Sequence, residues 1–281
     1  MSSRLKLRSA LDPDAQEDLR VLNGRLAAFY NSAAMAHYFA LADSINESWG
    51  ADLKPHHHLL AAIPNGASVL DVGCGSAPIA DHLAGRNVRF TGVDWSSEQI
   101  ARNAARKPDA EFVAGSLYDV DFGGRQFDVV TNLYVIEHAV WPHRLLDSLY
   151  RLAKPGGLIA ILTPPFRHGT YLKSFDYGLS AIPFKDKVRR LKWIDAALHA
   201  YQHRVVVPGV LRREYPRGTP QGRFLINLDP VGLRPGVAFF PDADAVYLSD
   251  TEEMLAWLVD LGAAPVAHWP EWGYVLAKKP A

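Results

Sequence analysis

Short apolar runs alternate with helical segments from residue 67 onward, and this alternation limits the possible folds more than any other feature of the chain. The runs have the length of buried strands, and the segments between them have the length and apolar spacing of helices. The predicted strands are 68–72, 88–93, 110–113, 127–132 and 158–163. Strands and helices that alternate in this way predict an α/β fold with a doubly wound, mostly parallel sheet.

The alternation stops after residue 163 and resumes near Ser249. Ser249 and Glu252 predict a capping box at the start of a helix over 254–261. Strands over 265–269 and 273–277 follow, and a tight turn separates them. Strands joined in this way form an antiparallel hairpin, which we expect at one end of the sheet.

These boundaries divide the chain into three parts. Residues 1–66 are expected to form an N-terminal helical arm, and residues 67–165 and 249–281 the α/β core. Residues 166–248 are then an insertion into the core, which we interpret as a lid over a substrate site. Apolar residues recur at helical spacing over 184–201, so the insertion is expected to contain one amphipathic helix.

The composition is that of a globular protein, and its charge balance disfavours a nucleic-acid partner. Hydrophobic residues make up 48% of the 281 residues, and 30 basic side chains balance 30 acidic ones. A neutral chain is not expected to bind nucleic acid through its overall charge. The single cysteine, Cys74, excludes an intrachain disulfide, and no apolar run is long enough to cross a bilayer. We therefore expect a cytoplasmic protein.

The neutral total conceals a basic segment in the insertion. Residues 164–220 carry eleven basic and four acidic side chains, with aromatic residues interleaved among them. This pattern favours a lid that recognises an anionic or aromatic small molecule. Contact between a basic amphipathic helix and an anionic membrane surface is a second, less favoured interpretation. A solvated helix face is the third.

The turn after the first core strand has the features of a ligand-binding loop. The strand ends near Asp71, and a Gly-x-Gly turn made by Gly73 and Gly75 leads into a helix. Glycines allow the backbone to approach a ligand closely, and Asp94 at the end of the next strand is placed to accept the hydroxyls of a ribose. Pro78 replaces the third glycine of a dinucleotide fingerprint, and no P-loop Lys-Ser/Thr pair is present, so NAD and ATP are disfavoured.

The motifs and their order resemble those of the class I S-adenosylmethionine-dependent methyltransferases, over roughly residues 67–165 and 249–280. The matching segments are 70–75, 92–96, 127–130, 136–138, 152–157 and 162–164. The sequence is most similar to the small-molecule branch that includes the ubiquinone-biosynthesis O-methyltransferases, through Glu137-His138 and Thr163-Pro164. The resemblance implies a Rossmann-like methyltransferase sheet and S-adenosylmethionine as the cofactor.

The resemblance also implies which residues bind the cofactor. Asp71, Gly73 and Gly75 would lie against its methionine part. Asp94 would hold the ribose hydroxyls, and Trp95 would pack on the adenine.

Four further positions complete the implied cofactor site. Ser116 and Leu117 would contact the adenine edge, and Asn132 and Leu133 would lie beside the reactive sulfonium. The family often has an aspartate where this chain has Ser116, although a serine can still accept a hydrogen bond from the exocyclic amine.

Candidate catalytic residues follow the fourth and fifth core strands, where open α/β sheets bind their ligands. The transferred methyl group is already activated, so the protein mainly aligns the nucleophile and removes its proton. His138 and His168 are therefore candidate bases, and Tyr30 resembles an aromatic residue of the family's lid. Glu137 with His138 is a weaker candidate for a divalent metal, and we predict no metal site.

The predicted function is methyl transfer by in-line displacement to an oxygen or nitrogen of a small molecule. A catalytically silent protein that binds the cofactor or a partner is the alternative, and a nicotinamide-dependent oxidoreductase is a third class. Methylation of nucleic-acid base amines is disfavoured, because Asn132-Leu133-Tyr134 departs from the Asn-Pro-Pro-Tyr motif of those enzymes. The sequence makes no prediction of the oligomeric state.

Overall fold

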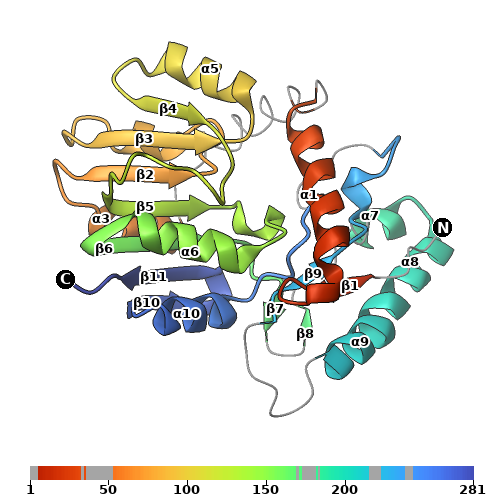
Figure 1. Cartoon of the computed structure of the whole chain (residues 1–281). Coiled ribbons are helices and arrows are strands. Elements are labelled where there is room, and N and C mark those ends of the chain that lie inside the picture. Colours follow the sequence, from red (N-terminus) through yellow and green to blue (C-terminus); the bar gives the residue numbers. More distant parts are fainter. Residues whose placement is uncertain are drawn as a thin grey trace.

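The computed structural model describes residues 6–32, 35, 53–168, 171–172, 182, 184–214, 223–237 and 243–281. Its centre is a seven-stranded sheet in the order β10-β11-β6-β5-β2-β3-β4 (Figure 1). The strands are β2 (Ser68–Val72), β3 (Arg89–Asp94), β4 (Glu111–Ala114), β5 (Phe127–Leu133), β6 (Ala153–Leu162), β10 (Ala264–Trp269) and β11 (Tyr274–Lys278). Neighbouring strands from β4 to β6 are parallel, whereas β11 runs antiparallel to both β6 and β10. The predicted doubly wound sheet with an antiparallel C-terminal hairpin is therefore confirmed.

Alternate side chains of the central strands enter two separate cores. On β2, Leu70 and Val72 belong to one buried cluster, whereas Val69 belongs to the other. The first cluster includes residues of α1 (Gln16–Tyr30), α6 (Pro142–Leu152) and α10 (Thr251–Asp260). The second includes residues of α3 (Lys54–Ala62), α4 (Pro78–His82) and α5 (Ser97–Arg106). Each face of the sheet is thus covered by helices, as a parallel sheet requires.

The helix α10 begins one residue later than its predicted cap. Asp250 is the N-cap, and its side chain accepts a hydrogen bond of 2.9 Å from the backbone N–H of Glu252. Ser249 instead donates through Oγ to the carbonyl oxygen of Pro164 at 2.6 Å. The predicted capping box is wrong, because two adjacent residues can both cap a helix and Asp250 takes that role. Ser249 joins the end of the insertion to the loop after β6.

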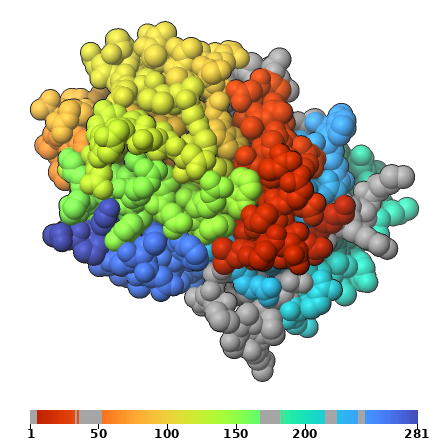
Figure 2. Space-filling model, in the orientation of Figure 1, coloured from red at the N-terminus to blue at the C-terminus, as the bar shows by residue number. Residues whose placement is uncertain are grey.

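A small antiparallel sheet joins the N-terminal arm to the insertion. The strand β1 (Leu7–Ser9) pairs with β9 (Leu225–Asn227), although the sequence predicts a helical arm and no strand in it. In the space-filling view the red atoms of the arm lie between the green core and the blue and teal atoms of the insertion (Figure 2). The arm therefore connects the two parts that flank the candidate site.

The helices of the insertion differ from the single amphipathic helix that the sequence predicts. They are α7 (Phe184–Arg189), α8 (Trp193–Tyr201), η3 (Gln202–Val206) and α9 (Val207–Glu214). Between α7 and α8 the chain turns at Leu191, whose φ is 56°. The prediction of one helix is wrong because a left-handed residue ends α7, and apolar spacing alone does not reveal such a break. No helix in the described ranges is long and apolar enough to cross a bilayer.

The close approach of β3 to the glycine loop and β4 gives a stability prediction. A Cβ at Gly92 would lie 2.8 Å from Sγ of Cys74 and 2.9 Å from the ring of Phe112. Gly92→Ala should therefore lower the free energy of unfolding by about 1–3 kcal/mol through overpacking. The matched change Gly24→Ala, in the open interior of α1, should raise it by about 0.5–1 kcal/mol. Urea unfolding of both variants measures this, and a stable Gly92→Ala protein would contradict the packing described.

Candidate active site

The glycine loop after β2 is held in place by the end of β3 and by the side chain of Val135. The backbone N–H groups of Gly73 and Cys74 both donate to the carbonyl oxygen of Val93, at 2.7 and 2.9 Å. Gly73 has a φ of 81°, and a Cβ there would lie 2.5 Å from the side chain of Val135. Only glycine satisfies both the positive φ and this close contact.

Asp94 at the end of β3 fixes the second glycine. Its Oδ2 accepts from the N–H of Gly75 and its Oδ1 from the N–H of Ser96, each at 2.9 Å. The Nδ2 of Asn103, a buried residue that the sequence analysis did not single out, donates to the carbonyl oxygen of Gly75 at 2.6 Å. Burial raises the pKa of this carboxyl group, the backbone N–H of Trp95 is a third group that lowers it, and the carboxylate keeps room for a further donor.

Open space borders this loop at its second glycine. A Cβ built on Gly75 would meet no atom of the described chain within 4 Å, and the same is true at Gly115 after β4. The two glycines therefore leave their backbones accessible, as a ligand lying across the ends of these strands requires.

Asp71 on β2 is a buried carboxyl group with an altered pKa. Burial raises its pKa to about 7, the hydrogen bond from Thr131 lowers it, and the neighbouring Asp94 raises it. The Oγ1 of Thr131 donates to Oδ1 of Asp71 at 2.7 Å. Two carboxyl groups at adjacent strand ends make this part of the site favourable for a positively charged ligand.

Asn132 and Leu133 end β5 beside Asp71. Asn132 is fully buried, and its Nδ2 donates to the carbonyl oxygen of Val72 at 2.7 Å. Its Oδ1 has no hydrogen-bond partner among the described residues. A buried acceptor left open in this way is available to a donor of a ligand. Leu133 is half-buried against the second core.

Aromatic side chains lie next to one another after the strands β3 and β4. The ring centroid of Trp95 lies 6.4 Å from that of Tyr30 and 6.2 Å from that of Tyr118. The Oγ of Ser116 accepts from the backbone N–H of Tyr118 at 3.2 Å, and Leu117 is buried in the main core. The arm thus brings Tyr30 to the predicted cofactor residues.

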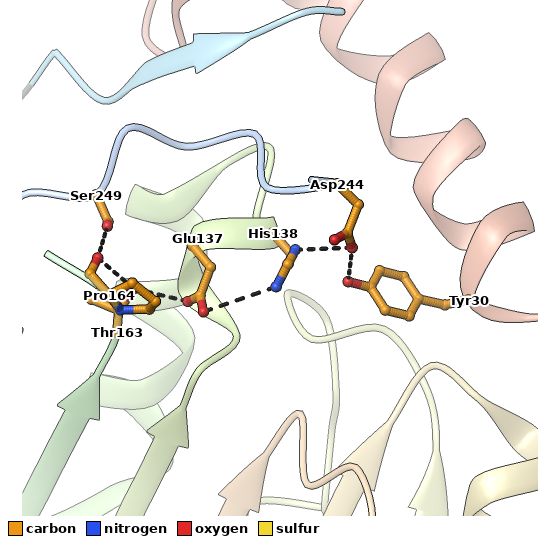
Figure 3. A network of polar contacts seen from close by, with 7 residues as sticks. All are labelled: Tyr30, Glu137, His138, Thr163, Pro164, Asp244 and Ser249. Atoms are coloured by element: carbon orange, nitrogen blue, oxygen red, sulfur yellow. Dashed lines mark hydrogen bonds and ion pairs between the residues drawn. The ribbon is translucent and has the colours of Figure 1, made fainter. Parts of the chain in front are cut away.

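A network of polar side chains links the arm, the loop after β5 and the insertion (Figure 3). The Nδ1 of His138 lies 3.2 Å from Oδ2 of Asp244, and Oη of Tyr30 donates to the same oxygen at 2.5 Å. The Nε2 of His138 lies 3.9 Å from Oε1 of Glu137. Thr163 donates through Oγ1 to Oε2 of Glu137 at 2.9 Å. The network therefore places His138 between two carboxylates.

The carboxylates of this network are buried, and Asp244 is stabilised in its charged form. Asp244 is 2% exposed and Glu137 is 1% exposed. Burial alone would raise the pKa of Asp244, but His138 and the hydroxyl of Tyr30 lower it below its ordinary value. Asp244 thus carries a negative charge next to the His138 ring at neutral pH.

The backbone of the insertion holds Asp244 in position. The N–H groups of Val246 and Tyr247 both donate to the carbonyl oxygen of Glu137, at 2.8 and 2.9 Å. Residues 243–249 are therefore docked on the short helix η2 (Ile136–His138). Asp244 could not be predicted from the sequence, because it lies far from His138 along the chain in a segment without periodicity.

The other predicted base, His168, lies in β7 (Arg167–His168), which pairs with β8 (Tyr171–Leu172). Its side chain is outside the described part of the structure, so it stays a prediction. No group of three or more His, Cys, Asp or Glu side chains within the described ranges could hold a metal ion.

Comparison with known proteins shows the family to which the chain belongs. A family model described as a methyltransferase domain matches residues 47–209, more than half of the chain. The chain belongs to this methyltransferase family. This confirms the resemblance to class I S-adenosylmethionine-dependent methyltransferases and S-adenosylmethionine as the cofactor.

Curated relatives of this methyltransferase match part of the chain. It is 32% identical to a probable S-adenosylmethionine-dependent methyltransferase of Mycolicibacterium smegmatis, over 35% of this chain and 38% of the relative. It is 32% identical to a ubiquinone biosynthesis O-methyltransferase of Thiobacillus denitrificans, over 42% of this chain and 54% of the relative. A demethylmenaquinone methyltransferase of Paenarthrobacter aurescens is 29% identical, over 34% of this chain and 38% of the relative. The methyltransferase therefore spans between about a third and about half of these relatives' lengths.

The raised pKa of Asp71 predicts how cofactor affinity depends on pH. S-adenosylmethionine carries a positive sulfonium, so it should bind better when Asp71 is ionised, above its pKa of about 7. Affinity should rise about ten-fold between about pH 6 and about pH 8. Titration calorimetry measures this change.

Asp71→Asn should remove the pH dependence, whereas the exposed control Asp109→Asn should retain it. An unchanged pH profile in Asp71→Asn would show that another group is responsible.

Proposed function

We propose that this methyltransferase transfers a methyl group from S-adenosylmethionine to an oxygen or nitrogen of a small molecule. The observation that carries the proposal is the contact between His138 and Asp244. His138 belongs to the loop after β5, and Val135 of the same loop lies against Gly73 of the glycine loop. A histidine paired with a buried carboxylate is a common arrangement for a general base.

The strand ends fit the cofactor in shape and charge. Asp94, which the backbone of the glycine loop and of Ser96 holds in place, would accept from the ribose hydroxyls, and Trp95 would pack on the adenine. The open backbone of Gly75, with Asp71 and the open acceptor of Asn132, would receive the charged methionine part. These features make the site complementary to a ligand that is cationic at one end and aromatic at the other.

The remaining predicted residues would complete the site with their backbones. Gly73 would keep the loop close to β5, and Leu133 would line the space beside the sulfur. Ser116 and Leu117 would offer backbone groups to the adenine edge, because the Ser116 hydroxyl accepts from Tyr118 and the Leu117 side chain is in the core.

His138 would act as the general base through Nε2. Since Nδ1 faces the Asp244 carboxylate, the ring proton belongs on Nδ1 and Nε2 keeps its lone pair. The bound cofactor supplies a methyl group that is already activated by its positively charged sulfur. The proton of the attacking hydroxyl or amine would therefore pass to Nε2 as the acceptor atom bonds to the methyl carbon and the bond between that carbon and the sulfur breaks, which would leave the sulfur as a neutral thioether.

The neighbours of His138 would stabilise it once it is protonated. Asp244 would balance the new positive charge at Nδ1, and Glu137 lies 3.9 Å from Nε2 on the other side. Tyr30 would hold the Asp244 carboxylate through its hydroxyl, as a positioning residue. This arrangement keeps the ring in one orientation before the substrate arrives.

A small-molecule acceptor is supported by the names of two relatives and by the insertion. The relatives are a ubiquinone biosynthesis O-methyltransferase and a demethylmenaquinone methyltransferase. The basic and aromatic residues of 164–220 would favour an acceptor that is anionic or aromatic.

Loss of the Asp94 carboxylate should abolish cofactor binding. Asp94→Ala removes the acceptors for the Gly75 and Ser96 N–H groups as well as those for the ribose. We expect the affinity for S-adenosylhomocysteine to fall by about a hundredfold, as calorimetry can measure. The exposed change Asp109→Ala should bind normally. No binding by the native chain, or equal binding by Asp94→Ala, would overturn the proposed cofactor site.

Removal of the base should lower turnover while cofactor binding persists. His138→Gln should reduce kcat about a hundredfold, and Asp244→Asn about ten-fold or more. Transfer of labelled methyl groups to small molecules of a cell extract provides the assay. Transfer at the native rate by His138→Gln would assign the base to another residue, and no transfer by the native chain would favour the catalytically silent alternative.

The pH profile distinguishes positioning by Asp244 from a merely structural role. Without the Asp244 carboxylate the protonated ring loses a partner, so Asp244→Asn should move the acid limb of the kcat/KM profile to lower pH. Tyr30→Phe should move it less, because the carboxylate remains. A uniform loss of activity at every pH in Asp244→Asn would contradict the assigned role.

A further inference from the structure

A band of apolar side chains lies exposed on the helices of the insertion, which we name the outer face. Its residues are Leu191, Trp193, Ile194, Leu198, Tyr201 and Val205, with exposed fractions between 49% and 77%. Ile194 and Leu191 are the most exposed, at 77% and 71%. Large apolar side chains gathered in one place on a surface mark an interaction site, whereas single ones do not.

Most of the outer face lies along one side of three consecutive helices, whose other side is buried. The helix α8 continues through η3 into α9, and Ile194, Leu198, Tyr201 and Val205 recur along it at helical spacing. The opposite side is buried, and its residues are Ala196, His199, His203, Val207 and Leu211. Packing against the rest of the chain thus accounts for the buried side and leaves the outer face exposed.

The helices that carry the outer face also carry many cationic side chains. Residues 184–213 contain eight basic and two acidic side chains. The exposed basic residues are Lys185, Arg189, Arg190, Lys192, Arg204, Arg212 and Arg213. Exposed aliphatic side chains with Trp and Tyr, bordered by Lys and Arg, are the composition of helices that lie in the surface of an anionic bilayer.

We propose that the outer face docks this methyltransferase on the surface of an anionic lipid bilayer. The leucine, isoleucine and tryptophan side chains enter the headgroup region, and the basic side chains contact lipid phosphates. A second copy of the chain is a poor occupant, because a symmetric contact would bring two faces of like positive charge together. The proposal is independent of methyl transfer.

Docking would bring the active site close to the membrane. Val207 and Leu211 of α9 pack in one buried cluster with Phe166, Ala245 and Leu248. These last three residues flank Thr163, Asp244 and Ser249, which belong to or adjoin the polar network of His138. A substrate that partitions into the bilayer would therefore be close to the site.

Flotation with lipid vesicles tests the proposal on the full chain. The protein should float with vesicles of phosphatidylcholine and phosphatidylglycerol, weakly with phosphatidylcholine alone, and less with both at high salt. The double change Arg189→Gln and Arg190→Gln should weaken binding to the anionic vesicles about 25-fold, at about five-fold per cation. Equal binding to both vesicle types, or none to either, would overturn the proposal.

A matched pair of substitutions separates the outer face from exposed apolar surface in general. Val205 on the outer face and Val21 on α1 are both helical and are 53% and 52% exposed. Val205→Glu should weaken vesicle binding about ten-fold, whereas Val21→Glu should leave it unchanged. Binding of S-adenosylhomocysteine by both variants verifies their folding.

Two outcomes of these experiments would contradict the proposed docking on a membrane. An equal loss of vesicle binding in Val205→Glu and Val21→Glu would mean that the outer face has no special role in membrane binding. A dimer of the native chain in sedimentation analysis without lipid, dissociated by Val205→Glu, would assign the face to a second copy instead.

Discussion

The charge of one buried carboxylate, Asp244, determines how the insertion and the core fit together. An ion removed from water costs several kcal/mol unless it gains partners. Asp244 gains them from His138 of the core loop and Tyr30 of the arm, so three distant segments meet at one oxygen atom. The backbone contacts of Val246 and Tyr247 with Glu137 fix the same junction. The contacts proposed for catalysis therefore also hold the arm, the core loop and the insertion together.

The insertion contributes to function in two ways that differ in physical character. On its inner side, 243–249 supplies a charged group to His138 through short polar contacts. On its outer side, the helical run that begins at α8 presents apolar and cationic side chains to solvent. The buried cluster that contains Val207 and Phe166 lies between them. The proposed cofactor site, the proposed general base and the proposed membrane-docking face would thus lie in adjacent layers of the chain.

The core could be predicted from the sequence because its signals are local. Strand periodicity and the Gly73-x-Gly75 turn locate β2 and its loop, and the structure keeps the predicted strand bounds within a few residues. The pairing of β1 with β9 and the contact of Asp244 with His138 could not be predicted in this way. They join segments far apart in the chain, and no local pattern specifies such a pairing. The break at Leu191 was missed because the apolar spacing continues across it.

A crystal structure with S-adenosylhomocysteine bound tests the central assignment most directly. We predict that Nδ1 of His138 stays on Asp244 while Nε2 faces the space in front of the sulfur atom, with Asp94 on the ribose. A sulfur atom remote from His138, or a His138 ring turned so that Nδ1 leaves Asp244 and Nε2 points away from that space, would contradict it.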